Sequence, residues 1–90
     1  MQSIDFEIEN QVIRILSDSF SVGHSVIDAS SRLVEDLYID SMGVVEIVMA
    51  LNGIFHVVLP QSEVAGWRVV ADIVSSVVRV SASNKKLLNL

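Results

Sequence analysis

Apolar residues near both ends of the chain recur at the three- and four-residue spacing of an amphipathic helix. In the first segment, from about Ile4 to Phe20, the shared face comprises Ile8, Val12, Ile15, Leu16 and Phe20. In the last segment, from about Val69 to Val80, it comprises Val70, Ile73, Val74 and Val77. This periodicity predicts two helices, each with one apolar face.

The segment from about Ser41 to Phe55 gives conflicting local signals. Its β-branched run at residues 44–48 suits a strand, whereas residues 49–51 favour a helix. Helical spacing is shared by four of its apolar residues, Val45, Val48, Met49 and Phe55. We therefore predict another helix here, which Gly53 weakens or bends near its end. A short turn is expected around residues 63–67.

A polar loop rich in small residues joins these helices, from about Val22 to Asp40. A loop of this length in a small domain usually has a function or carries short helical turns. We expect Leu33, Val34 and Leu37 to anchor it onto the core.

The composition excludes several kinds of site. The 90-residue chain is one domain, and its lack of cysteine excludes disulfides, cysteine-ligated metals and a catalytic thiol of its own. His24 and His56 are isolated, so no metal site is expected. No apolar stretch reaches the ~18–20 residues of a membrane span, and the acidic N-terminus lacks the basic start of a secretory signal. We expect a cytoplasmic protein without stable membrane insertion.

The net charge of −5 is divided unevenly along the chain. Residues 1–46 hold nine acidic residues and two arginines, a balance of −7, whereas residues 47–90 hold two acidic and four basic residues, a balance of +2. The first half would therefore repel nucleic acid and suit a basic protein partner. The sequence also lacks the basic and aromatic pattern of a nucleic-acid surface. We expect a monomer that binds proteins and no nucleic acid.

The boundary between the loop and the helix that follows places an acid, Asp40, before a hydroxyl, Ser41. Ser41 can be an N-cap, whose side-chain oxygen accepts a hydrogen bond from an amide of the first turn. It can also be an exposed attachment point, because the unpaired amides and the positive dipole end of a helix favour a phosphodiester. A capping box is absent, because Val44 stands where its Glu or Gln would be. Local chemistry leaves both interpretations open.

The neighbours of Ser41 form an ordered set. Residues 33–42 read L-V-E-D-L-Y-I-D-S-M, residues 45–51 read V-E-I-V-M-A-L, and Phe55 and Leu59-Pro60 follow. This set resembles the acyl carrier protein family. In that family an E-D-L run and an Asp-Ser-Leu-like motif lead into a V-E-ϕ-V-M-A-L helix, a phenylalanine and an I-P turn. The match is continuous and in register over about thirty positions.

The resemblance implies an all-α bundle of three main helices plus one short helix, with a carrier domain over residues 1–80. The tail at residues 81–90 shows no helical spacing and is expected to fray. The resemblance further implies that a phosphopantetheinyl transferase attaches 4′-phosphopantetheine to Ser41, while Asp40 shapes the loop and helps the transferase to engage.

The thiol of such an arm would supply the sulfur that the chain lacks, so that acyl groups are carried as thioesters. The protein is then expected to be a substrate and scaffold and no enzyme. Its further partners would be acyl-transferring or synthase enzymes of fatty-acid, specialised lipid or polyketide biosynthesis.

The resemblance also implies two surfaces on or near the helix that begins at Ser41. Its partner-facing residues are expected to be Met42, Glu46 and Met49. Its acyl pocket is expected to be lined by Val44, Val48, Leu51, Val64 and Trp67. The single tryptophan has two interpretations that can both hold: an aromatic residue that caps the core, or a side chain that narrows the pocket.

Several positions depart from the family pattern. Residues 52–54 and His56 stand where acidic residues are usual, so the docking face is less acidic and more apolar. This favours a dedicated partner in a specialised pathway, and it leaves a second hypothesis: a helical adaptor that keeps the carrier fold but binds a partner without being modified. Arg68 and Val69 replace small hydroxylated residues before the last helix, which predicts a weaker cap there. Residues 38–40 lack the glycines of peptidyl carriers, which favours acyl cargo.

Overall fold

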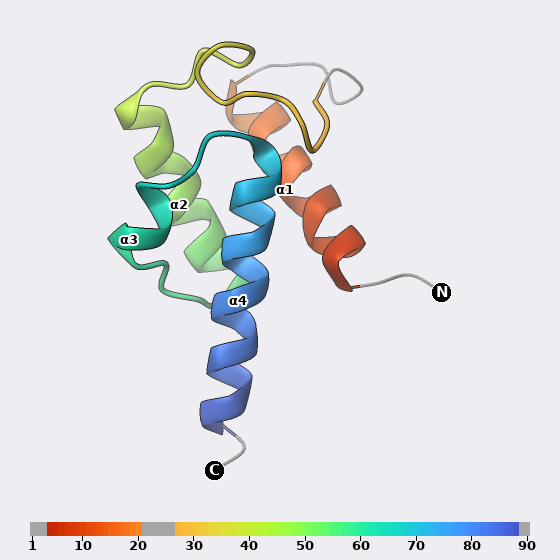
Figure 1. The fold of residues 1–90 in the computed structure, drawn as a ribbon, viewed down its shortest axis with the longest axis vertical. Helices are drawn as coiled ribbons and strands as arrows, with labels where there is room; N and C mark the ends of the chain where they lie inside the picture. The colour runs from red at the N-terminus through yellow and green to blue at the C-terminus, as the bar shows by residue number, and fades with distance from the viewer. Residues whose placement is uncertain (1–3, 21–26, 89–90) are drawn as a thin grey trace.

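Helices dominate the computed structural model, which describes residues 4–20 and 27–88 (Figure 1). The elements in chain order are α1 (Ile4–Phe20), α2 (Ser41–Phe55), α3 (Gln61–Val64) and α4 (Val70–Leu88). Three long helices and one short helix confirm the predicted all-α fold class. The bounds of α1 and α2 agree with the prediction, and the conflicting signals in residues 41–55 are resolved in favour of a helix.

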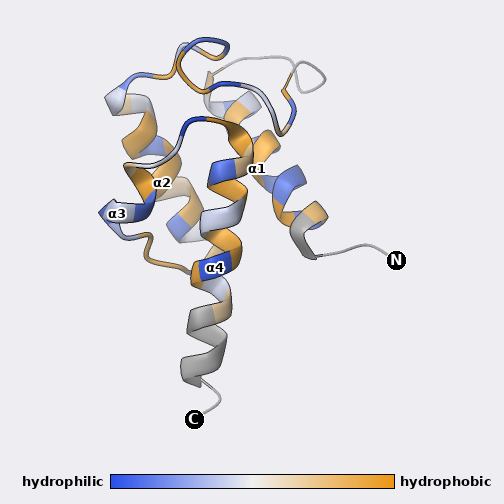
Figure 2. Ribbon diagram, viewed as in Figure 1, coloured by the Kyte–Doolittle hydropathy of each residue, from blue (hydrophilic) through white to orange (hydrophobic). Residues whose placement is uncertain are grey.

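The three long helices enclose one core. α1 packs against both α2 and α4, α2 also contacts α4, and α3 lies against α4. The predicted inner faces of α1 and α4 are buried, except that Phe20 is half-buried. Figure 2 shows apolar and polar residues alternating along both helices. The buried apolar residues of these two helices are Ile8, Val12, Ile13, Ile15, Leu16, Val70, Ile73, Val74 and Val77.

The inner face of α2 differs from the one that its spacing indicated. Its buried residues are Gly43, Ile47 and Leu51, whereas Val45 is 56% and Met49 68% exposed. The physical reason is that α2 carries apolar residues on nearly every side. Periodicity identifies a buried face only when the opposite face is polar.

The loop before α2 carries a single helical turn near Leu33 and Leu37, both of which are buried as predicted. Val34 was expected to anchor the loop as well, but this prediction is wrong, because its side chain is 64% exposed. The next residue along a helical turn points about 100° away from the one before it, so Val34 cannot share the inward direction of Leu33. Ile39 provides a further anchor and is 2% exposed. Val22, the predicted start of the loop, lies outside the described residues.

Backbone hydrogen bonds tie this loop to the start of α4, where the two segments run side by side across one end of the bundle (Figure 1). The amide of Leu33 donates to the carbonyl of Arg68 at 2.9 Å, and the amide of Val70 donates to the carbonyl of Ser31 at 3.0 Å. The second bond satisfies an amide that the first turn of α4 leaves unpaired. The segment that leads to Ser41 is therefore attached to α4 as well as to α2.

The start of α4 is capped, although its sequence predicted a weaker cap. A carboxylate oxygen of Asp72 accepts hydrogen bonds from the amides of Arg68 at 2.8 Å and Val69 at 3.0 Å. An acid in the first turn can thus reach back to the amides that precede the helix, which is the half of a capping box that an N3 acid provides. Arg68 and Val69 offer no side-chain acceptor for this helix start, and Asp72 stabilises it from within the first turn.

α4 continues beyond its predicted end at Val80 and remains helical through Leu88. Residues 81–88 contain no glycine or proline and include alanine, lysine and leucine, which favour helices. Within the described ranges, no helix is both long enough and apolar enough to cross a membrane.

Candidate functional site

Asp40, and not Ser41, is the N-cap of α2. Its backbone is extended, with φ −94° and ψ −175°, and its Oδ1 accepts a 2.9 Å hydrogen bond from the amide of Gly43. Its carbonyl accepts the 3.0 Å bond from the amide of Val44 that opens the helix. The interpretation of Ser41 as the cap is therefore wrong, because the carboxylate one residue earlier takes that role. Ser41 is the first helical residue.

The hydroxyl of Ser41 is exposed and has no hydrogen bond within the described part of the chain. The backbone amides of Ser41 and Met42, the first two of the helix, also make no hydrogen bond within this part of the chain. These amides and the helix dipole provide a favourable site for an anion. A phosphodiester on the Ser41 oxygen would lie next to them, so the residues present fit a phosphate-linked group.

The turn before this site is held by an ion pair. Asp36 accepts from the backbone amide of Arg32 at 2.8 Å and from its guanidinium at 2.9 Å. The hydrogen bond from the Arg32 side chain is the largest cause of the lowered pKa of Asp36. Tyr38 follows in the left-handed conformation, with φ 56°, and its side chain is 85% exposed. The side chain of Ile39 is buried in the core, and the next two residues, Asp40 and Ser41, are exposed at the surface.

Gly43 allows the first turn of α2 to approach α1 closely. A Cβ at this position would lie 2.9 Å from Cε1 of Phe20 and 3.0 Å from Cγ2 of Ile39. These distances are too short for ordinary carbon contacts. The sequence analysis missed this role, although a glycine inside a predicted helix is a signal of close packing.

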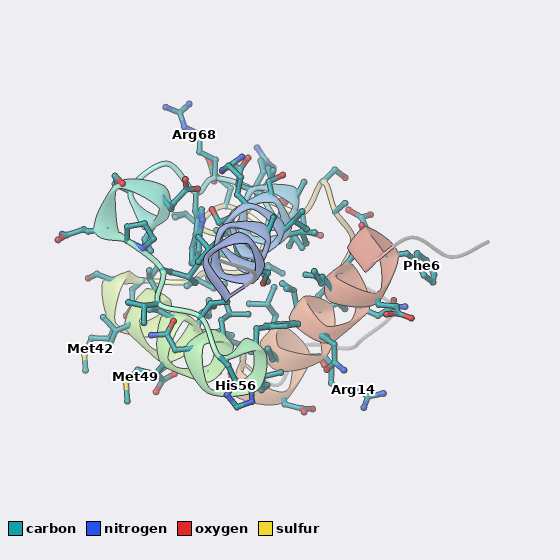
Figure 3. All side chains as sticks on the ribbon, turned by 90° about the horizontal axis from the view of Figure 1, so that it is seen from below. Phe6, Arg14, Met42, Met49, His56 and Arg68 are labelled. Carbon is teal, nitrogen blue, oxygen red and sulfur yellow. The ribbon has the colours of Figure 1, made fainter. Side chains whose placement is uncertain are left out.

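The three residues expected to face partners lie on the outside of α2. Met42 is 79% and Met49 68% exposed, and Glu46 is exposed between them. Figure 3 shows Met42 and Met49 projecting from the same side of α2, away from the bundle. Val45, which was not included in this set, is also more than half exposed. The outer face of α2 is therefore mainly apolar, with one acid.

The five residues expected to line an acyl pocket lie at or near the core. Leu51 is fully buried, and the other four, Val44, Val48, Val64 and Trp67, are half-buried. Three of these, Val44, Val64 and Trp67, pack against the core cluster. Trp67 thus covers part of the core, which agrees with one of its two interpretations and leaves the other open.

A network of polar side chains surrounds Trp67 and was not found from the sequence. Trp67 Nε1 donates a 2.8 Å hydrogen bond to Oγ of Ser76, and this hydroxyl donates a 2.7 Å bond to Oε1 of Glu63. Arg79 donates to both carboxylate oxygens of Glu63. Hydrogen bonds from Arg79 and then Ser76 lower the pKa of Glu63. The available signal was a serine between Ile73 and Val77 on the apolar face of the last helix.

His56 ends α2 in the left-handed conformation, with φ 54°, and its side chain is exposed. Figure 3 shows it directed away from the bundle. The helix reaches Phe55 without a break at Gly53. Within residues 6–20 and 27–82, no three or more His, Cys, Asp or Glu side chains are grouped to hold a metal ion. His24 lies outside the described residues.

A four-helix fold with an exposed serine at the start of α2 fits a carrier of a phosphate-linked group. Comparison with known proteins shows this class. Residues 10–77 match the phosphopantetheine attachment site family. An acyl carrier protein of Akkermansia muciniphila is 34% identical over 76 residues, which cover 84% of this chain and 95% of that protein. An acyl carrier protein of Rickettsia bellii is 36% identical over 75 residues, which cover 83% of this chain and 86% of that protein.

The chain belongs to the acyl carrier protein family. It is a non-catalytic carrier of acyl groups with a covalently attached 4′-phosphopantetheine prosthetic group. It interacts with a phosphopantetheinyl transferase and with synthases and acyl-transferring enzymes as partner classes.

Proposed function

We propose that Ser41 carries the phosphopantetheine arm. The observation that carries this proposal is the exposed, unbonded hydroxyl on the first residue of α2. Asp40 supplies the N-cap, so Ser41 is free to react without loss of the first turn. Ile39 and Gly43 hold the flanking backbone against the core, which keeps the serine at a fixed surface position.

The attachment needs one covalent step at Ser41. Its Oγ forms a bond to the phosphorus of the pantetheine phosphate of coenzyme A, and adenosine 3′,5′-bisphosphate leaves. The hydroxyl proton passes to the transferase. Once bound, the arm supplies the thiol that holds acyl groups as thioesters. The amides of Ser41 and Met42, which make no hydrogen bond within the described residues, would be available to the phosphodiester.

The acyl chain would be received between α2 and the segment that contains α3 and Trp67. Val44, Val48 and Leu51 lie on α2, whereas Val64 ends α3 and Trp67 follows it. Their burial supports an apolar lining for this space. The shared chemistry of these five side chains favours a hydrocarbon chain over a polar cargo.

Partner enzymes would dock on the outer face of α2 through Met42, Glu46 and Met49. Glu46 is the sole charged residue between Ser41 and Phe55. Docking by such a face depends on apolar contact more than on long-range attraction, so association should change little with ionic strength. This supports a dedicated partner in a specialised lipid, fatty-acid or polyketide pathway, and we place the carrier and this partner in the cytoplasm as part of the proposal.

The attachment site is tested with a broad-range phosphopantetheinyl transferase, coenzyme A and intact-mass measurement. The wild type should gain the mass of one arm, and Ser41→Ala should gain none. Ser62→Ala is the matched control, because Ser62 is also an exposed serine at the start of a helix, and it should be modified like the wild type. Wild type that stays unmodified, and that is recovered from its native source in a stable complex, would instead favour the adaptor.

The docking face is tested by the steady-state kinetics of arm attachment. Met42→Ala combined with Met49→Ala should raise KM about fivefold, the effect of about 1 kcal/mol of lost contact. Val58→Ala is the control, because Val58 is 80% exposed but lies beyond α2. Equal effects of the two changes would show that docking does not use this face.

A further inference from the structure

α3 has few apolar contacts to hold it in place. Its four residues, Gln61–Val64, include no buried side chain. Hydrophobic stabilisation scales with the apolar area removed from water, so α3 gains little of it. Val64 and Trp67 pack against the core, and the polar network that links Glu63 and Trp67 to α4 adds to the attachment of this segment.

Within this network, Ser76 is the residue whose loss matters most. Arg79 is 62% exposed, and an ion pair so open to water contributes little to stability. Ser76, in contrast, is 1% exposed and bonds to both Trp67 and Glu63. Removing this hydroxyl leaves the indole N–H of Trp67 without its acceptor, which costs more than the average hydrogen bond contributes. Glu63 keeps its two bonds from Arg79 but loses its link to the buried part of α4.

The position of the network connects it with the proposed acyl pocket. Val64 and Trp67 belong to the segment that Ser76 holds, and both cover the core. Leu51 of α2 and Val77 of α4 are fully buried in that core. Movement of α3 away from α4 would uncover this apolar region, and its return would enclose whatever occupies it.

We propose that Ser76 is a positioning residue for the acyl cargo. Its hydroxyl acts as a latch that holds α3 and the Trp67 indole against α4, and the acyl chain is enclosed while the latch is closed. The proposal rests on the proposed function, because it assumes that cargo attached at Ser41 reaches the core beside Trp67. It adds a determinant of how well a cargo of given length is shielded.

The latch itself is tested in the protein without an arm, by amide hydrogen exchange. Ser76→Ala should raise the exchange rates of residues 63–66 about tenfold, the effect of about 1.4 kcal/mol, and leave those of α1 unchanged. Ser75→Ala is the matched control, because Ser75 is the exposed neighbour on the same helix. The latch would be overturned if exchange became faster throughout the protein, or if it became no faster in residues 63–66.

The effect on cargo is tested with two thioesters of the arm-bearing protein, octanoyl and acetyl, by their rates of cleavage with hydroxylamine. Ser76→Ala should speed cleavage of the octanoyl thioester about tenfold and leave the acetyl thioester unchanged, because a two-carbon group is too short to reach the core. Equal cleavage rates of the octanoyl thioester in variant and wild type would overturn the proposal. So would an equal acceleration of both thioesters.

A failure of the proposed function is recognised separately. If Ser41 accepts no arm, the cargo test uses Ser41→Cys, which becomes the one thiol in a chain without cysteine. This thiol is alkylated with an octyl or a methyl group on a linker of pantetheine length. The octyl group should reduce acrylamide quenching of Trp67 fluorescence more than the methyl group does, and Ser76→Ala should abolish the difference. The latch would be overturned if the octyl and methyl adducts of Ser41→Cys were quenched equally. It would also be overturned if their difference persisted after Ser76→Ala was added.

Discussion

The Oδ1 of Asp40 lies 2.9 Å from the backbone nitrogen of Gly43 and closes the first turn of α2. This hydrogen bond assigns the N-cap to Asp40, whereas the sequence allowed Ser41 to be either the cap or the attachment residue. The acid organises the helix start, and the neighbouring serine keeps its hydroxyl for chemistry. An attachment residue that also served as the cap would lose its cap on modification.

Replacement of Asp40 should therefore act on stability before it acts on chemistry. Asp40→Ala should lower the free energy of unfolding by about 1 kcal/mol, because an amide of the first turn loses its acceptor. Asp40→Asn keeps a side-chain oxygen and should remain close to the wild type. Urea unfolding at neutral pH measures both. Equal losses in the two variants would mean that charge, and not the hydrogen bond, stabilises the helix start.

The two glycines of α2 should respond in opposite directions to alanine. Gly53→Ala should stabilise the protein by about 1 kcal/mol, because a Cβ there meets nothing within 4 Å and alanine favours the helix. Gly43→Ala should destabilise it by about 1 kcal/mol, because the clash with Phe20 and Ile39 outweighs the same helical gain. Thermal or denaturant unfolding of the pair decides this. Stabilisation by both would show that Phe20 moves aside freely.

At position 38 glycine should give a more stable protein than alanine, whereas at position 53 alanine should give the more stable protein. At φ 56° the left-handed backbone costs a residue with a Cβ about 1 kcal/mol or more. The ring is 85% exposed, so its removal loses little packing. Tyr38→Gly should therefore be about 1 kcal/mol more stable than Tyr38→Ala in denaturant unfolding. An alanine variant of equal or greater stability would mean that the turn adopts another conformation in solution.

The Glu63 carboxylate should make stability depend on pH in the acidic range. Hydrogen bonds from Arg79 and Ser76 lower its pKa in the folded protein, so folding favours the ionised form. This contribution is fully present above the unfolded pKa of about 4 and is lost as the pH falls through the lower folded pKa. Unfolding free energies measured from about pH 6 to 3 should fall less steeply for Glu63→Gln and for Arg79→Ala than for the wild type. If the unfolding free energy of the variants changed with pH in parallel with that of the wild type, Glu63 would not be the group responsible.

The sequence by itself determined the three long helices, apart from the end of α4, and the position of the attachment motif. The inner faces of α1 and α4 could be predicted because each helix has an apolar face opposite a polar one. The Asp40-Ser41 pair could be placed at a helix start because the order of its neighbours matches a family. Both kinds of information lie in residues that are close together along the chain.

Only the tertiary structure decided which face of α2 is buried and what holds α3. α2 is apolar on nearly every side, so its packing against α1 and α4, and not its spacing, selects Ile47 and Leu51 for the core. The bonds of Ser76 reach nine residues back to Trp67 and thirteen residues back to Glu63. Such contacts depend on how segments far apart in the sequence pack together, and the spacing of apolar residues within one helix does not predict this packing.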